Sequence, residues 1–189
     1  HLSSLLFDTP PAPQSALDDW FEREGFGIDT DGFWQPLPLL QAFREDAALL
    51  DAISYSWPAA ERANAPACQR MYSLRKIGSI LQAIRDRLPG TAWIYYQDVT
   101  NTALQYPYID QITAITPDFQ WATYHTYQSV TPEANPQRSI QWTTPTIDYA
   151  GEGLIVSVSI PVYIDDTFTG LWSIDLPMEK LYTHMRFEK

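Results

Sequence analysis

Five polar side chains near the end of the sequence have types and spacings that suit recognition of a small molecule. Asp148 precedes two apolar runs, residues 153–164 and 168–176. Ser157 and Ser159 lie in the first run, and Ser173 and Asp175 lie in the second. Residues two positions apart in a strand share a face, so each run gathers its polar residues on one face. Serine leaves space beside it, and a desolvated carboxylate requires a hydrogen-bond donor or a cation. The pattern indicates a site for a ligand with an ammonium or hydroxyl group.

The two carboxylates also have other interpretations. Asp175 ends its run and could accept a hydrogen bond from a neighbouring backbone N–H. Asp148 opens the stretch DYAGEG and could shape a turn there. In an aromatic cleft the pair could also act as the acid and base of a glycoside hydrolase, or bind carbohydrate without turnover. The sequence leaves these alternatives open.

Four aromatic residues fall within nine positions: Phe119, Trp121, Tyr124 and Tyr127. They could form a small apolar cluster under a long loop, or wall a pocket and hold a cation against their π-faces. Trp121 is the strongest candidate for a pocket wall. Arg138, one of 12 basic residues, could bind a ligand carboxylate or simply lie solvated in its loop. We therefore add Trp121, Tyr124, Tyr127 and Arg138 to the candidate ligand-binding residues.

Metal and cofactor chemistry has little support in the sequence. The three histidines are far apart, and Cys68 is the single cysteine, which excludes an intrachain disulfide and a cysteine-based zinc site. The stretch DTDG at residues 29–32 resembles the start of a calcium loop, but Phe33 and Trp34 follow where a ligand and a glycine are needed. No glycine-rich phosphate loop and no nucleophile elbow is present. We expect no metal, no cofactor and no catalytic residue.

Residues 15–90 have mostly helical periodicity. Ser15 is a plausible helix cap, and apolar residues recur at near-helical spacing over residues 37–57 and 68–88. Pro89-Gly90 would end the last helix. We expect one short helix followed by two long amphipathic helices.

After Gly90 the sequence becomes typical of strands. Aromatic and β-branched runs cover residues 91–99, 139–147, 153–164 and 168–176, and Asp165-Asp166-Thr167 is a turn of hairpin length between the last two. Residues 106–138 form a long irregular connection, which suggests a lid or binding loop unless it is partly helical. Helices followed by antiparallel strands predict an α+β domain.

Composition excludes one class of partner. The 189 residues are 45% hydrophobic, which suits a globular chain, and the formal net charge is −11. An acidic surface repels phosphate backbones, so we expect no nucleic-acid partner. No run approaches the roughly 18 apolar residues of a membrane helix.

Five segments, in this order, resemble the Cache family of PAS-like extracytoplasmic sensor domains. They are AWIYYQD (92–98), YP (106–107), TPEANPQRSIQWTTPTID (131–148), GEGLIVSVSIPVY (151–163) and FTGLWSIDLPMEKL (168–181). The resemblance implies long N-terminal helices packed on one face of a PAS-like antiparallel β-sheet. It also implies a pocket for a small polar metabolite on the other face.

The same resemblance implies a function and a setting. Such domains are periplasmic or extracellular, non-enzymatic parts of transmembrane receptors: chemoreceptors, diguanylate cyclases, or histidine kinases of two-component systems. We expect a piece of such a receptor taken from between two transmembrane helices, dimerising through its N-terminal helices and signalling by ligand-biased packing of sheet on helix. Its divisions would be an arm (1–14), a helical segment (15–90), a ligand-binding sheet domain (91–182) and a connector toward the membrane (183–189).

The sequence departs from the family at one functional motif. Members that bind α-amino acids tend to carry Arg-x-Trp-Tyr in the insertion, then Tyr-x-Asp, then an aspartate on the last strand. When Trp121 is matched to that Trp, both aspartates are present, but Phe119 replaces the arginine, Ala122 the first tyrosine and Thr146 the second. Without the arginine, common amino acids are expected to bind poorly.

Overall fold

The computed structural model describes residues 11–46, 51–58, 65–110, 116 and 118–184. The helices are α2 (Gln14–Glu24), α3 (Leu37–Glu45), α4 (Ala65–Leu74), α5 (Gly78–Arg87), α6 (His125–Gln128) and α7 (Met178–His184), with a 3₁₀ turn at Trp121–Thr123. The strands are β1 (Phe26–Ile28), β2 (Phe33–Pro36), β3 (Ser54–Pro58), β4 (Trp93–Asp98), β5 (Ala103–Tyr106), β6 (Gln141–Trp142), β7 (Thr146–Ile147), β8 (Leu154–Ile164) and β9 (Thr167–Pro177). None of the helices in these ranges is long and apolar enough to cross a membrane.

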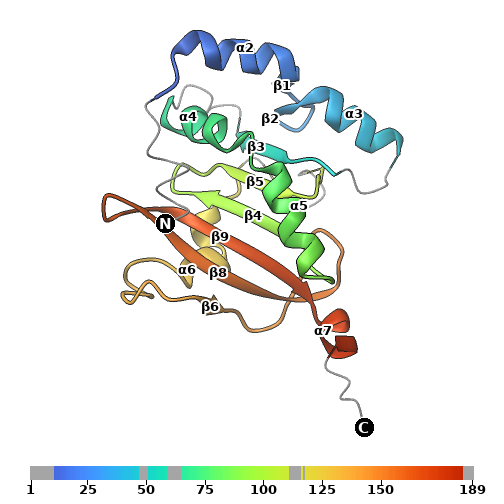
Figure 1. Ribbon diagram of the computed structural model, residues 1–189, viewed down its shortest axis with the longest axis vertical. Coiled ribbons are helices and arrows are strands. Elements are labelled where there is room, and N and C mark those ends of the chain that lie inside the picture. The colour runs from blue at the N-terminus through green and yellow to red at the C-terminus, as the bar shows by residue number, and fades with distance from the viewer. Residues whose placement is uncertain (1–10, 47–50, 59–64, 111–115, 117, 185–189) are drawn as a thin grey trace.

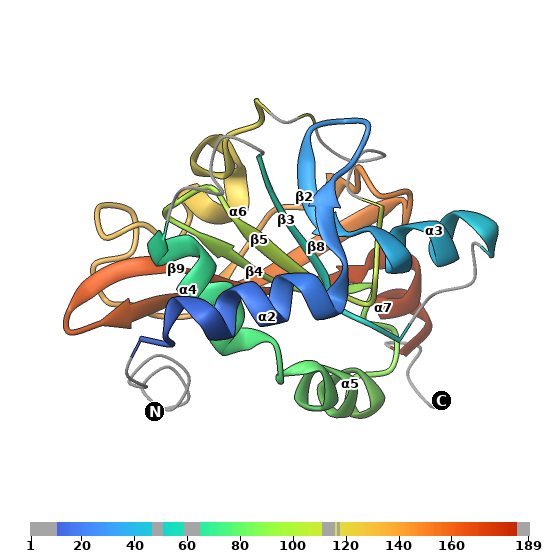
Figure 2. The same cartoon turned by 90° about the horizontal axis from the view of Figure 1, so that it is seen from above.

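The nine strands form one antiparallel sheet. The strand order is β1-β2-β3-β5-β4-β9-β8-β6, and β7 also pairs with β8. Figures 1 and 2 show α4 and α5 on one face of the sheet and α6 on the opposite face. The α+β prediction, with N-terminal helices packed on an antiparallel sheet, is confirmed.

The predicted hairpin forms as β8 and β9. Its turn residues Asp165 and Asp166 both have positive φ, 45° and 63°, as the tight turns that match strand twist require. The register places Ser157 opposite Asp175 and Ser159 opposite Ser173. All four polar residues therefore share one face of the sheet.

Two apolar clusters pack against the two faces of the central strands. Tyr96 on β4 belongs to the cluster under the helices, with Met71 and Leu74 of α4. Its neighbour Tyr95 belongs to the opposite cluster, which includes Leu171 and is covered by α6 and adjoining segments. The strict alternation along β4 lets one strand serve both layers.

The helices are shorter than predicted. The expected helix over 37–57 ends at Glu45, and residues 54–58 form β3 instead, paired with β5. The expected helix over 68–88 consists of α4 and α5, which are separated at residues 75–77. The apolar spacing could not reveal these differences, because strand pairing across about 50 residues is a tertiary effect that overrides local periodicity.

The predicted limits of the segments also differ from the structure. Pro13, not Ser15, precedes the first helical turn of α2, and no side chain caps that turn. The stretch predicted as helical, 15–90, contains β1, β2 and β3, which join the same sheet as the later strands. Of the predicted arm and connector, residues 1–10 and 185–189 lie outside the described residues.

Candidate ligand-binding site

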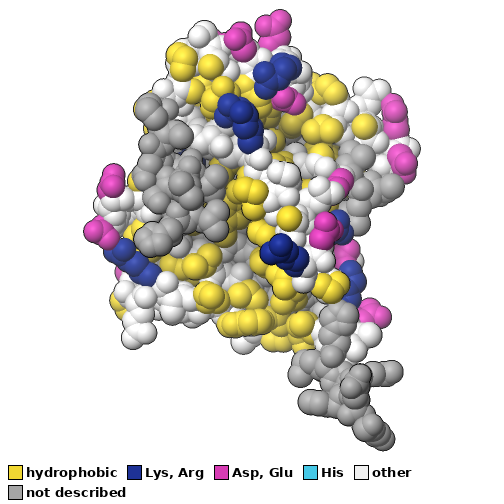
Figure 3. Space-filling model, in the orientation of Figure 1, with side chains coloured by type: hydrophobic (Ala, Val, Ile, Leu, Met, Phe, Trp, Pro, Cys, Tyr) yellow, Lys and Arg dark blue, Asp and Glu magenta, His cyan; other side chains and the backbone are white. Residues whose placement is uncertain are grey.

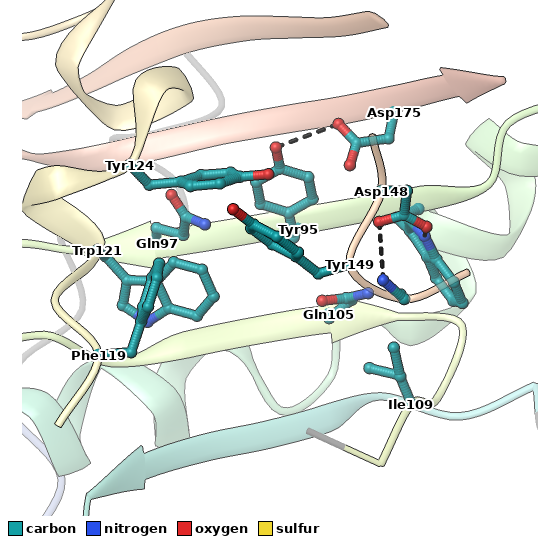
Figure 4. A pocket seen from close by; sticks show the side chains of 12 residues that line it. Tyr95, Gln97, Gln105, Ile109, Phe119, Trp121, Tyr124, Asp148, Tyr149 and Asp175 are labelled. Carbon is teal, nitrogen blue, oxygen red and sulfur yellow. Dashed lines mark hydrogen bonds between the residues drawn. The ribbon is translucent and has the colours of Figure 1, made fainter. Parts of the chain in front are cut away.

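A small pocket lies on the sheet face opposite α4 and α5. Its floor comes from β4, β5 and β9, and its walls come from segments 119–124 and 148–150 (Figure 4). The cavity volume is about 50 Å³. It is lined by Trp93, Tyr95, Gln97, Gln105, Ile109, Phe119, Trp121, Tyr124, Asp148, Tyr149, Ala150 and Asp175.

Asp175 is a buried carboxyl group at one end of this pocket. It is 6% exposed, and its Oδ1 accepts a hydrogen bond of 3.1 Å from the Tyr95 hydroxyl. Burial raises the pKa of Asp175 to about 7, with a smaller increase from the charge of Asp148, while the hydroxyls of Ser157 and Tyr95 oppose the rise. A nearby cation would favour its ionised form.

Gln97 adds an unpaired acceptor to the floor. Its side chain lies on the same face of β4 as Tyr95, two residues away, and is 2% exposed. Its Oε1 is buried without a hydrogen-bond partner among the described residues. An amide oxygen removed from water in this way costs roughly 1–3 kcal/mol until a donor reaches it.

Asp148 shapes a turn and lines the pocket at once. Its carboxylate accepts hydrogen bonds from the indole N–H of Trp93 at 3.0 Å and from the backbone N–H groups of Ala150 at 3.1 Å and Glu152 at 2.9 Å. The turn interpretation of Asp148 is thus confirmed. Its negative charge nevertheless faces the cavity (Figure 4).

Aromatic rings form the far wall. Figure 4 shows Phe119 and Trp121 at the end of the pocket away from the two aspartates, with their ring centroids 5.0 Å apart and edge to face. Asn101, in the turn between β4 and β5, holds this wall: its amide donates to the Phe119 carbonyl and its Oδ1 accepts from the Trp121 N–H, both at 2.9 Å. Burial raises the pKa of the Tyr124 hydroxyl, which therefore remains protonated.

Four of the nine sequence candidates meet in this pocket: Trp121, Tyr124, Asp148 and Asp175. The three serines, Ser157, Ser159 and Ser173, lie on the same face of the sheet, but their side chains are buried and do not line the pocket. Ser159 and Ser173 hydrogen-bond to each other at 2.9 Å, and Ser157 lies opposite Asp175.

The other two candidates lie outside the pocket lining. Tyr127 is 6% exposed and packs edge to face on Phe168, within the cluster beneath α6. The Arg138 guanidinium pairs with Asp166 at 2.8 Å and lies 3.9 Å from the Tyr163 ring centroid. Tyr127 thus lies in an apolar cluster under the loop, as its structural alternative proposed, whereas Arg138 is held by Asp166 and Tyr163 at the hairpin turn.

Sequence reasoning missed several lining residues, chiefly Trp93, Tyr95, Gln97, Gln105 and Tyr149. The run AWIYYQD reads as a buried strand, and all six residues of β4 are indeed buried. The available signal was alternation: every second residue of a strand buried on both faces must face the polar side of the hairpin. Using it required knowing that β4 pairs with β9.

A larger groove of about 500 Å³ lies on the other face, between α5 and the strands β8 and β9. Its lining is almost entirely aliphatic, apart from Trp172 and the mutually hydrogen-bonded Ser159 and Ser173. Hydrophobic side chains are prominent on that side of the molecule (Figure 3). Because the groove offers no charged or unpaired polar group to orient a ligand, the smaller pocket is the better candidate site.

Within the described residues, no group of three or more His, Cys, Asp or Glu side chains is arranged to hold a metal ion. The described lining of the pocket contains two carboxylates and no lysine, arginine or histidine. Its chemistry is thus that of acceptors, phenols and aromatic faces.

No family model and no curated protein sequence matches this chain. Among solved structures, it is similar to ligand-binding domains of bacterial chemoreceptors. These include Tlp3 of Campylobacter jejuni with 4-methylisoleucine (21% identity, 59% of this chain and 43% of that one, TM-score 0.45). They also include PctC of Pseudomonas aeruginosa with GABA (19%, 90% and 63%, 0.46) and CtaA of Pseudomonas fluorescens with L-serine (16%, 94% and 66%, 0.47). The chain thus spans about two fifths to two thirds of the length of these domains.

Proposed function

We propose that this chain is a non-catalytic sensor domain that binds a small polar molecule in the pocket between Asp175 and Trp121. The observation that carries the proposal is the floor, where the Asp175 carboxyl is buried beside the cavity with a phenol as its partner and the Gln97 amide oxygen is buried without a hydrogen-bond partner among the described residues. Buried polar atoms are normally satisfied, and unpaired ones collect at functional sites. A ligand that completes their hydrogen bonds recovers the cost of burying them.

The sheet provides a route from the pocket to the helices. On β4, Tyr95 and Gln97 face the pocket, whereas Tyr96 and Asp98 face α4. Asp98 forms a buried ion pair of 2.8 Å with Arg70 of α4. Ligand contact with one face of β4 therefore bears directly on the packing of α4 against the other, and we propose this as the signalling step.

The receptor setting belongs to the same proposal and is supported by the sequence motifs. The domain would face the periplasm or exterior as part of a transmembrane histidine kinase, diguanylate cyclase or chemoreceptor, and would dimerise through its N-terminal helices. The helix α7 begins at Met178, directly after the strand that carries Asp175. Movement of β9 would therefore be transmitted to α7 and the connector that follows. Sedimentation at several protein concentrations tests the dimer.

A thermal-shift screen of polar metabolites tests the sensor proposal. Binding at 100 times Kd stabilises the folded state by about 2.7 kcal/mol, which raises the melting temperature measurably. Trp121→Ala is expected to abolish the shift, whereas Trp142→Ala is the control, because Trp142 is 64% exposed and lies outside the pocket lining. A shift that survives Trp121→Ala, or no shift with any metabolite, would contradict the proposal.

The glycoside hydrolase alternative uses the same two carboxylates. Both line the pocket, but Asp148 already accepts three hydrogen bonds that hold its turn. Only Asp175 therefore remains available for proton transfer, and a two-carboxylate mechanism lacks its second member. Release of product from a panel of chromogenic sugars would favour the hydrolase over the sensor.

A further inference from the structure

The charge of the pocket lining selects one kind of ligand. Among the residues that the structure describes, two aspartates face the cavity and no basic side chain does. The sequence candidate for a carboxylate clamp, Arg138, lies at the β8–β9 turn instead, where it pairs with Asp166 and the Tyr163 ring. A ligand carboxylate would thus be desolvated beside two acidic groups with no positive partner among the described residues, an arrangement that disfavours binding. A ligand cation would be attracted by both.

The hydrogen-bonding atoms point the same way. Two donors of the floor are already used, since the Tyr95 hydroxyl donates to Asp175 and the Trp93 indole donates to Asp148. Gln97 is 2% exposed, and its Oε1 has no hydrogen-bond partner among the described residues. An ammonium group supplies three N–H donors and no acceptor, which complements such a floor.

Size and the aromatic wall narrow the class further. A volume of about 50 Å³ holds only a few water-sized groups, since one water needs roughly 10–15 Å³. The rings of Trp121 and Tyr124 line the same cavity and can hold a cation against their faces. The space thus suits an amino group with one or two further heavy atoms, and any longer tail would point out of the cavity.

We infer that the ligand is a small primary amine that carries no carboxylate beside its amino group. The inference rests on the proposed sensor function and names its ligand class. The ammonium group lies at the Asp175 end of the cavity, and its carbon chain extends from there toward Gln97 and Trp121. Asp148 contributes charge from its turn without leaving its own hydrogen bonds.

Matched pairs of ligands test the inference directly. Ethylamine and L-alanine differ only in the carboxylate, as do ethanolamine and L-serine, and ethanol serves as the uncharged control. Isothermal calorimetry on the wild-type chain is expected to give amines at least tenfold tighter binding than their amino-acid partners, and no heat with ethanol. Equal or tighter binding of L-alanine or L-serine would overturn the inference.

Two variants of equal charge locate the binding. Asp175→Asn is expected to weaken ethylamine at least thirtyfold, whereas Asp166→Asn, an exposed residue outside the pocket, should change affinity less than twofold. Unchanged affinity in Asp175→Asn would overturn the inference. If that variant does not fold, the wild-type comparison of amine and amino acid still decides it.

The outcomes also separate the ligand class from the sensor function. If a polyol or a carboxylic acid produces a Trp121-dependent melting shift while amines do not, the ligand class is wrong and the sensor function stands. If no compound in the screen binds, both fail. If amines bind and Asp175→Asn abolishes the binding, both are supported.

Discussion

At the scale of single residues, Asp175 governs how the empty protein responds to pH. Its pKa of about 7 when folded lies above its ordinary 3.8, so the folded protein keeps a proton that the unfolded chain loses. The free energy of unfolding should therefore fall as pH rises from about 4 to 7 and level off above 7, by up to about 4 kcal/mol. We expect Asp175→Asn to remove this contribution, as measured by urea unfolding at pH 5 and pH 8.

The difference between variant and wild type isolates Asp175 from its neighbours. Burial lowers the pKa of nearby His125 and raises those of Tyr95 and Tyr124. His125 contributes the opposite slope, since its protonation at low pH opposes folding, but it is present in both proteins. Parallel pH profiles for wild type and Asp175→Asn would show that Asp175 titrates normally.

Phe119 is expected to decide whether amino acids are rejected. It lines the pocket beside Trp121, and the motif match proposed from the sequence gives this position to the arginine of amino-acid-binding domains. Phe119→Arg should improve L-alanine binding at least tenfold, because a guanidinium gives a carboxylate two charge-assisted hydrogen bonds, and should weaken ethylamine by charge repulsion. Calorimetry measures both, with Phe119→Leu as the control for loss of the ring. Unchanged L-alanine affinity would contradict the role given to this position.

The sequence predicted some of the site residues and not others, for a physical reason. Trp121, Tyr124 and Asp175 could be predicted because their residue types stand out within their local stretches of sequence. Tyr95 and Gln97 lie in a strand that is buried throughout, where composition does not show which face is which. Only pairing with β9, some 80 residues later, makes Tyr95 a neighbour of Asp175.

At the scale of elements, α4 is fastened to the sheet by the ion pair between Arg70 and Asp98. The Asp98 side chain is fully buried and that of Arg70 is 14% exposed. Arg70→Met should cost about 3–5 kcal/mol, because it leaves a buried carboxylate unpaired, and burial already raises the pKa of Asp98. The double variant Arg70→Met/Asp98→Asn should recover much of the loss. Denaturant unfolding measures both.

The matched control for this prediction is the exposed ion pair between Arg138 and Asp166. Its side chains are 47% and 87% exposed, so Arg138→Met should lower the free energy of unfolding far less than Arg70→Met does. If the two arginine variants are equally destabilised, burial of the Arg70–Asp98 ion pair does not determine how much that pair contributes to stability. If Arg70→Met also leaves ligand affinity and the melting shift intact, the proposed route from pocket to helix loses its support.

Elements with a local signal were predicted, and those fixed by distant partners were not. The hairpin β8–β9 has its alternation and its turn within one stretch of sequence. By contrast, Leu50 and Ile53 continue the helical spacing of α3, yet Ser54 and Tyr55 pair with β5. No window of local sequence contains both members of that pair.

At the scale of the whole molecule, one hydrophobic core includes residues from both sides of the predicted division at residue 90. The core under the helices joins Met71, Leu74 and Leu81 from before this position to Tyr96 and Leu104 after it. A fragment of residues 91–189 would expose that face of the sheet to water, and each large side chain buried there is worth about 1.5–3 kcal/mol. We expect no cooperative thermal unfolding of the fragment by circular dichroism, and a single transition for the whole chain.

A fragment that unfolds cooperatively near the wild-type melting temperature would contradict this view of the core. Two separate transitions in the whole chain would do the same, because they would show that the helices and the later strands fold independently. Fluorescence and circular dichroism recorded together on the same sample provide the check.

The reactivity of Cys68 toward thiol reagents can report how often the core beneath α4 opens. It is the single thiol of the chain, lies on α4, and is 7% exposed within the core that α4 shares with the sheet. A thiol reagent can reach its sulfur only when this part of the core opens, so the rate of modification counts those openings. The rate of Cys68 modification, measured with and without a bound ligand, therefore reports whether binding on one face of the sheet makes α4 on the other face open less or more often.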